Sequence, residues 1–210
     1  MSNPSNPSAP PSGIVPAVAP GIVPGISEDL PTDEASVLAA TRTWLERAVI
    51  GLNLCPFAKA VHVKQQIRYV VSQANEPEQL LAELEAELKL LADADPEQVE
   101  MTLLVHPQVL QDFIDYNDFL DIADQALERM ELDGDLQIAS FHPDYQFEGT
   151  AFDDISNFSN RSPYPTLHLL RESSIDAAVE AFPDAADIYE HNIETLENLG
   201  RRGWIELFKA

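Results

Sequence analysis

The sequence predicts an α/β fold, a single domain in which a small and mostly parallel sheet of about four strands carries helices packed on it. Two observations favour this class. Short segments rich in β-branched and aromatic residues alternate with longer segments whose apolar residues recur at helical spacing. Strands that are separated by helices are usually parallel. In addition, 210 residues of which 45% are hydrophobic suffice to bury one core.

The first expected helix runs from Glu34 to Gly51, with Thr32 or Asp33 as its N-cap and Gly51 as its end. The element order resembles that of a thioredoxin-like domain with extra N- and C-terminal helices, although the Cys-x-x-Cys motif is missing. The remaining expected elements, in chain order, are a strand at 67–72, a helix at 77–91, a strand at 101–106, a helix at 113–130, strands at 136–142 and 166–171, and helices at 173–182 and 183–199.

Residues 1–33 differ in composition from the rest of the chain. Half of the sixteen prolines lie within the first thirty-one residues, and Gly-Ile-Val-Pro occurs twice there. This composition favours a disordered, partly extended tail and leaves residues 34–210 as the single α/β domain. Because the prolines interrupt every apolar run in this segment, we expect no secretory signal.

The charge of the chain argues against several classes of partner. Thirty-six acidic residues oppose twelve basic ones, which gives a formal net charge of −24 and a pI near 4.2. Such a chain repels polyanions, so we expect neither nucleic-acid binding nor attachment to an anionic membrane. No apolar stretch reaches the roughly 18–20 residues of a membrane span, and one cysteine cannot form an internal disulfide. These features favour a cytoplasmic location and leave the oligomeric state open.

Two of the expected strands end in the same way. One ends in Leu-Leu-Val followed by His106 and Pro107, and another in Ala-Ser-Phe followed by His142 and Pro143. In a parallel sheet both ends lie at one edge, where open α/β sheets bind ligands. We therefore expect two imidazoles close together at this edge, either as catalytic groups or as structural residues with satisfied hydrogen bonds.

Cys55, the single cysteine, follows the first expected helix within a basic stretch of the chain. A positive environment lowers the pKa of a thiol and attracts an anionic substrate, although the C-terminal side of a helix does not stabilise a thiolate. The alternatives are an inert apolar cysteine and basic residues that only neutralise acidic helices. The basic residues of this stretch are Arg42, Arg47, Lys59, Lys64 and Arg68, against the single acidic residue Glu46.

The connection between the third and fourth expected strands is long and rich in hydrogen-bonding side chains, which is typical of functional loops. Asp144 and Tyr145 are candidates to orient or assist His142 in acid–base chemistry. Arg161 and Arg171 are candidates to clamp a carboxylate or phosphate. The full set of candidate substrate-binding residues is Arg68, Asn160, Arg161, Tyr164 and Arg171.

The alternation of side chains along the fourth expected strand limits these schemes. In a strand at 166–171, His168 and Leu170 share one face, whereas Arg171 lies on the other. His168 and Arg171 are therefore not expected to converge on one ligand.

These residues support three hypotheses. The first is an enzyme acting on a small anionic molecule, with Cys55 as nucleophile or redox centre, His106 or His142 as general base, and Tyr145 as an assisting group. The second is a mononuclear metal site in which His106 and His142 are ligands, joined by Cys55, His168 or Asp144. The third is a non-catalytic module that binds a ligand or a partner. We rank the first hypothesis ahead of the second because no close metal-ligand spacing is present.

Several motifs in this sequence are long and specific. They are Trp-Leu-Glu-Arg-Ala-Val-Ile-Gly-Leu-Asn-Leu-Cys-Pro-Phe-Ala at 44–58, Thr-Leu-Leu-Val-His-Pro at 102–107, Phe-His-Pro-Asp-Tyr-Gln-Phe at 141–147 and Asn-Arg-Ser-Pro-Tyr-Pro-Thr-Leu-His-Leu-Leu-Arg-Glu at 160–172. Over about residues 35–207 the chain resembles a bacterial family catalogued as domain of unknown function 1415. The resemblance implies one domain and carries no activity, cofactor or catalytic residue.

Overall fold

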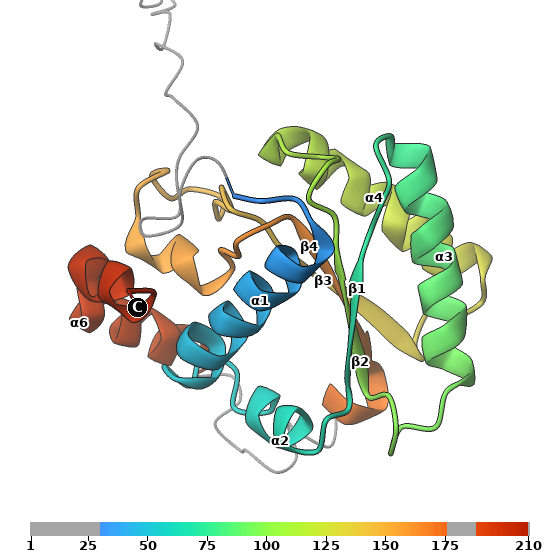
Figure 1. Cartoon of the computed structure of the whole chain (residues 1–210), viewed down its shortest axis with the longest axis horizontal. Coiled ribbons are helices and arrows are strands. Elements are labelled where there is room, and N and C mark those ends of the chain that lie inside the picture. Colours follow the sequence, from blue (N-terminus) through green and yellow to red (C-terminus); the bar gives the residue numbers. More distant parts are fainter. Residues whose placement is uncertain (1–29, 176–187, 210) are drawn as a thin grey trace, which may run out of the picture.

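A computed structural model describes residues 30–175 and 188–209. The predicted tail lies almost entirely outside these residues, as does most of the helix expected at 173–182, whereas residues 188–199 of the helix expected at 183–199 are described and are helical. A four-stranded sheet forms the centre of the described fold (Figure 1). Its strands are β1 (Ile67–Val71), β2 (Met101–Val105), β3 (Leu136–Phe141) and β4 (Thr166–Arg171).

Helices cover both faces of this sheet, with α3 and α4 on one face and α1 and α6 on the other (Figure 1). The first expected helix forms as α1, which continues as the π-helical segment η1. A short helix that the sequence analysis did not predict, α2, follows. The described helices are α1 (Glu34–Trp44), η1 (Leu45–Ile50), α2 (Ala58–Val63), α3 (Pro77–Asp93), α4 (Phe113–Arg129), the 3₁₀ helix η2 (Ile155–Ser159) and α6 (Ile188–Leu207).

The sheet is mixed, which corrects the expectation of a mostly parallel one. The strand order is β1-β2-β4-β3, β1 and β2 are parallel, and β4 is antiparallel to both of its neighbours. The reason lies in the connection from β3 to β4, which contains only the short helix η2 and no crossover helix. The chain therefore returns in the opposite direction and inserts β4 between β2 and β3.

The three strands that precede β4 nevertheless run in the same direction. β1 is parallel to β2, and because β4 is antiparallel to both β2 and β3, these two also share a direction. The predicted common edge for the ends of β2 and β3 is therefore confirmed. The predicted alternation of helices and strands is confirmed as well, whereas the thioredoxin-like comparison stays a prediction.

Apolar side chains at helical spacing fasten the helices to the sheet. On the α3 and α4 face, Leu80, Leu84, Leu88 and Leu91 of α3 are wholly buried against the strands. On the other face, Trp44 packs against Phe141 of β3, and its indole N–H donates to the Arg161 carbonyl at 2.8 Å. In the described part of the chain, no helix is long and apolar enough to cross a membrane.

Candidate functional site

His106 and His142 are brought together at the edge where β1, β2 and β3 end, in agreement with the sequence prediction. Each follows the last residue of its strand, and both side chains are wholly buried on the sheet face that α4 covers. The ring of Tyr116 from α4 contacts both imidazoles, with centre-to-centre distances of 5.7 Å to His106 and 5.0 Å to His142. The Tyr116 hydroxyl donates to the Thr166 carbonyl at 2.9 Å, which fixes the ring between strand and helix.

His106 has one ring nitrogen bonded and the other free. Its Nδ1 lies 2.9 Å from the Val109 carbonyl, and because a carbonyl only accepts, Nδ1 carries the proton. Nε2 is then the lone-pair nitrogen, and it is buried with no described partner. Burial lowers the pKa of His106 to about 4, so the ring is neutral at physiological pH.

His142 has both ring nitrogens engaged. Nε2 donates to the Leu110 carbonyl at 3.3 Å, and Nδ1 accepts from the Asp144 backbone N–H at 3.0 Å. Burial again lowers the pKa of this imidazole to about 4. Leu110 is held with a φ of 55°, a left-handed conformation that is rare for such a side chain. The two histidines thus bond consecutive carbonyls and hold the loop between β2 and α4.

The half-buried Asp144 and the buried Arg161 place two opposite charges near His142, with no direct hydrogen bond between them. Arg161 is 2% exposed and donates to the carbonyls of Tyr145 at 3.1 Å and Phe152 at 2.7 Å. Burial lowers the pKa of Arg161 to about 10, whereas it raises the pKa of Asp144, which the positive charge of Arg161 in turn lowers. One carboxylate oxygen of Asp144 is buried without a described partner. Arg161 is therefore committed to backbone carbonyls rather than free to clamp a substrate.

Tyr145, Asn160 and Tyr164 are all held by contacts within the fold. The Tyr145 ring packs 5.3 Å from that of Phe113. The Asn160 carbonyl accepts from the His142 backbone N–H at 3.2 Å. The Tyr164 hydroxyl donates to the Pro31 carbonyl at 2.7 Å. The Tyr164 side chain also belongs to an apolar cluster with Val37 of α1 and Val105 of β2. All three residues belong to the connection between β3 and β4 and help to hold it in place.

The predicted separation of His168 and Arg171 is confirmed. His168 packs 6.0 Å from Phe141 on the α1 face, and its Nε2 lies 3.1 Å from the Met101 sulfur. Arg171 instead lies on the α3 face, where it donates to the carbonyls of Leu91 at 2.6 Å and Ala94 at 2.8 Å. It therefore bonds carbonyls at the C-terminal end of α3, where regular helical hydrogen bonds stop.

Cys55 is not brought together with the histidines. It packs into the apolar cluster on the α1 and α6 face, with Leu54 and Ala58 as buried members of that cluster. His106 and His142 lie on the opposite face, in contact with Tyr116. A thiol activated by either imidazole requires direct contact between the two groups, which this arrangement does not provide.

The two histidines also do not form a metal site in this arrangement. Both nitrogens of His142 are already hydrogen-bonded, so neither offers a free lone pair to an ion. Within residues 30–175 and 188–209, no three His, Cys, Asp or Glu side chains are grouped so that they could hold a metal.

A cavity of about 320 Å³ lies elsewhere, along β1. This strand is at the end of the sheet, between α1 on one side and α3 on the other (Figure 1). The walls of the cavity come from α1, from β1 and from the segment before β2. The lining residues are Leu38, Arg42, Gln65, Ile67, Arg68, Tyr69, Gln98 and Val99.

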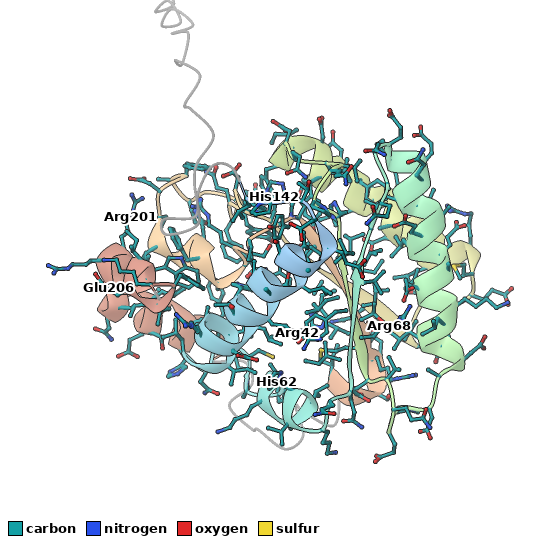
Figure 2. All side chains as sticks on the ribbon, in the orientation of Figure 1. Arg42, His62, Arg68, His142, Arg201 and Glu206 are labelled. Carbon is teal, nitrogen blue, oxygen red and sulfur yellow. The ribbon has the colours of Figure 1, made fainter. Side chains whose placement is uncertain are left out.

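Two arginines of the predicted basic stretch therefore meet at one cavity. The Arg42 guanidinium lies over the Tyr69 ring, 4.7 Å from its centre, and forms no ion pair with a described carboxylate. Arg68 projects to the other side of β1 and binds Glu87 of α3 through two hydrogen bonds of 2.7 Å and 2.9 Å. Figure 2 shows Arg42 on the α1 side of the strand and Arg68 on the α3 side.

A comparison with models of protein families assigns the chain to one of them. A family model described as "Protein of unknown function (DUF1415)" matches residues 36–206. The chain belongs to this family. The match agrees with the resemblance that the sequence motifs indicate and brings no activity with it. No curated protein and no solved structure matches the chain.

The sequence analysis of this DUF1415 member missed two groups of site residues. Tyr116 contacts both strand-end histidines, but its position on α4 resembles that of any buried aromatic residue. Gln65, Tyr69 and Gln98 line the cavity, yet their spacing in the chain carries no motif. The excess of positive charge at 42–68 is the sequence feature that could have indicated the cavity, because this stretch contains both cavity arginines.

Proposed function

We propose that this domain binds a small anionic molecule in the cavity beside β1. The observation that carries the proposal is the state of Arg42. Its guanidinium lines the cavity and forms neither an ion pair nor a hydrogen bond with any residue that the structure describes, in a chain of net charge −24. An unpaired cation in such an acidic protein is available to a ligand of opposite charge.

The chemistry of the lining suits a carboxylate or a phosphate. Arg42 offers a planar set of N–H donors that matches two oxygens of either group, and the Tyr69 ring supports it from one side. The amides of Gln65 and Gln98 supply further donors and acceptors. A ligand in this cavity therefore meets both a charge and hydrogen bonds that orient it.

Arg68 contributes a second, fixed guanidinium, whose charge Glu87 already balances and whose Nη1 has no partner among the described residues. Its Nε and Nη2 are held by Glu87, which raises the pKa of Arg68 and keeps the guanidinium charged. The side chain of Glu87 is only 12% exposed, so the pair is partly shielded from water. The orientation of Arg68 is thus set before a ligand arrives, which lowers the entropy lost on binding.

A catalytic role for the strand-end histidines has weaker support. His106 Nε2 is chemically free, but the side chain is 0% exposed and lies on other elements than those that line the cavity. Neither a general base nor a nucleophile acts without access to substrate. The expected cytoplasmic location and the expected lack of nucleic-acid binding stay predictions within this proposal.

The proposal is tested by calorimetric titration of the protein with citrate and with inorganic phosphate. Arg42→Gln is expected to weaken binding about tenfold or more, as loss of a charge-assisted hydrogen bond does. The matched control is Arg202→Gln, which removes the same charge from an exposed arginine of α6 that has no ion pair or hydrogen bond among the described residues. Equal binding by both variants, or no binding of either anion by the unaltered protein, contradicts the proposal.

A further inference from the structure

The outer edge of β1 carries unpaired backbone groups. The Gln66 carbonyl accepts from the Glu100 N–H at 2.9 Å, and the Ser72 N–H donates to the Val105 carbonyl at 2.8 Å, so both of these residues face β2. Residues of a strand alternate in the side to which they direct their backbone N–H and C=O groups. Ile67, Tyr69 and Val71 therefore direct theirs away from the sheet, and no hydrogen bond to them is found in the described structure.

This edge lacks the backbone features that prevent strand addition in many natural sheets. β1 contains neither proline nor glycine, and it has no bulge in its pairing with β2. All five of its residues are half-buried, with α1 and α3 on either side of the strand (Figure 1). The cavity described above opens along the same edge, since Ile67 and Tyr69 line it.

The positions of the two arginines specify what fits there. Tyr69 and Arg68 are consecutive, so their side chains lie on opposite sides of β1. Arg42, stacked on Tyr69, therefore lies on one side of the strand and the Arg68 guanidinium on the other, as Figure 2 shows. In an added strand, consecutive residues also point to opposite sides. Two adjacent acidic residues of an added strand would thus meet one arginine each.

We propose that an extended peptide segment with two adjacent acidic residues adds to the edge of β1 as a further strand, and that it is the anionic ligand of the cavity. This inference rests on the proposed function and names the class of its ligand. Backbone hydrogen bonds to Ile67, Tyr69 and Val71 supply affinity, and the contacts with Arg42 and Arg68 supply specificity.

Charge favours a peptide over a second copy of this chain. Two carboxylates near this edge already have partners, since Glu87 is bound by Arg68 and Glu46 lies 3.6 Å from His62. Pairing of two β1 edges would instead bring the arginines of both copies together and join two chains of net charge −24. A short peptide brings no second set of arginines and only a few negative charges, so it meets less of this repulsion.

The test uses short synthetic peptides with Asp-Glu at the centre and Val and Thr on both sides, labelled for fluorescence anisotropy. The matched control peptide has Asn-Gln at the centre. Two further versions are N-methylated at alternate residues, one at the odd positions and one at the even positions. Methylation of residues that face β1 blocks strand pairing, whereas methylation of the others leaves it intact.

The expected result is that one N-methylated version binds within about threefold of the parent peptide and the other binds at least about tenfold more weakly. Binding should slow hydrogen exchange at the amides of Ile67, Tyr69 and Val71. The Asn-Gln peptide should bind at least about tenfold more weakly than the Asp-Glu peptide. Arg42→Gln should reduce this preference, because it removes one of the two arginine contacts.

Four outcomes overturn the inference. Equal binding of both N-methylated versions excludes strand addition, as does unchanged exchange at the three amides. No preference for Asp-Glu over Asn-Gln excludes the acidic ligand. If the protein dimerises in sedimentation experiments and binds no peptide, the edge of β1 pairs with a second copy of the chain instead. In each case citrate binding that depends on Arg42 leaves the proposed function standing, so the two failures are distinguishable.

Discussion

The Arg42 guanidinium is stacked 4.7 Å from the centre of the Tyr69 ring, which joins a cation of α1 to the middle residue of β1. Burial raises the pKa of Tyr69, so the phenol stays neutral and the ring face remains attractive to a cation. Because both residues line the cavity, their contact determines where the positive charge meets a ligand.

This contact predicts a difference between two substitutions of Tyr69. Tyr69→Leu removes the aromatic face and should weaken citrate binding about two- to fivefold, the value of an exposed cation–π contact of about 0.5–1 kcal/mol. Tyr69→Phe keeps the ring and should bind within about twofold of the unaltered protein. Calorimetric titration of both variants measures the difference, and similar affinities for the two would show that the ring does not position Arg42.

His142 should support stability rather than ligand binding. His142→Ala leaves the Leu110 carbonyl and the Asp144 N–H without their partner and should lower the free energy of unfolding by about 2–4 kcal/mol. Urea denaturation measures this loss, with His62→Ala on the partly exposed helix α2 as the control. The citrate affinity of the folded variant should not change; a large loss of affinity would place His142 in the binding site.

Buried neutral histidines predict a loss of stability in mild acid. The pKa of His106 is lowered to about 4 in the folded state, whereas an unfolded histidine titrates near 6.5. The unfolded chain therefore takes up a proton first, and stability is lost as the pH falls from about 6.5 towards about 4. At about pH 5 the loss is about 2 kcal/mol for one such histidine.

His106→Gln isolates this contribution. Comparison of its urea midpoints with those of the unaltered protein, at about pH 7 and about pH 5, cancels the effect of the many carboxylates. The variant should lose less stability than the unaltered protein between the two pH values. An identical loss would contradict this, because it would mean that His106 has the same pKa in the folded and the unfolded chain.

Cys55 should be dispensable for ligand binding. It packs on the α1 and α6 face as part of an apolar cluster and does not line the cavity. Cys55→Ala is expected to change citrate affinity less than about twofold and to cost about 1 kcal/mol of stability at most, as small changes in partly buried residues do. Arg42→Gln, measured alongside, provides the comparison, and a loss of binding on the scale of that variant would argue for a role of the thiol.

The sequence predicted local structure better than long-range arrangement. The strand that ends at His106 and the one that ends at His142 were visible because β-rich runs stop at proline. The insertion of β4 between β2 and β3 could not be predicted, because pairing between strands depends on how the loop at 142–165 packs. The faces of His168 and Arg171 followed from alternation within one strand, which requires no knowledge of partners.

In the candidate site, too, the sequence predicted the local features and not the contacts between distant segments. The positive stretch at 42–68 pointed to an anion, and two of its arginines do line the cavity. The sequence could not show that Arg42 stacks on Tyr69, because that contact depends on how α1 docks against β1. Nor could it show that Cys55 and His106 lie on opposite faces of the sheet, since the order of elements does not reveal which helix covers which face.

Binding of an anion beside β1 can be mapped by NMR of the backbone amides during titration with citrate. Shifts are expected at Gln65, Ile67, Tyr69 and Gln98, which line the cavity, with little change near His106 or His142. Shifts confined to the residues around those two histidines, or no saturable shift at all, would contradict binding beside β1.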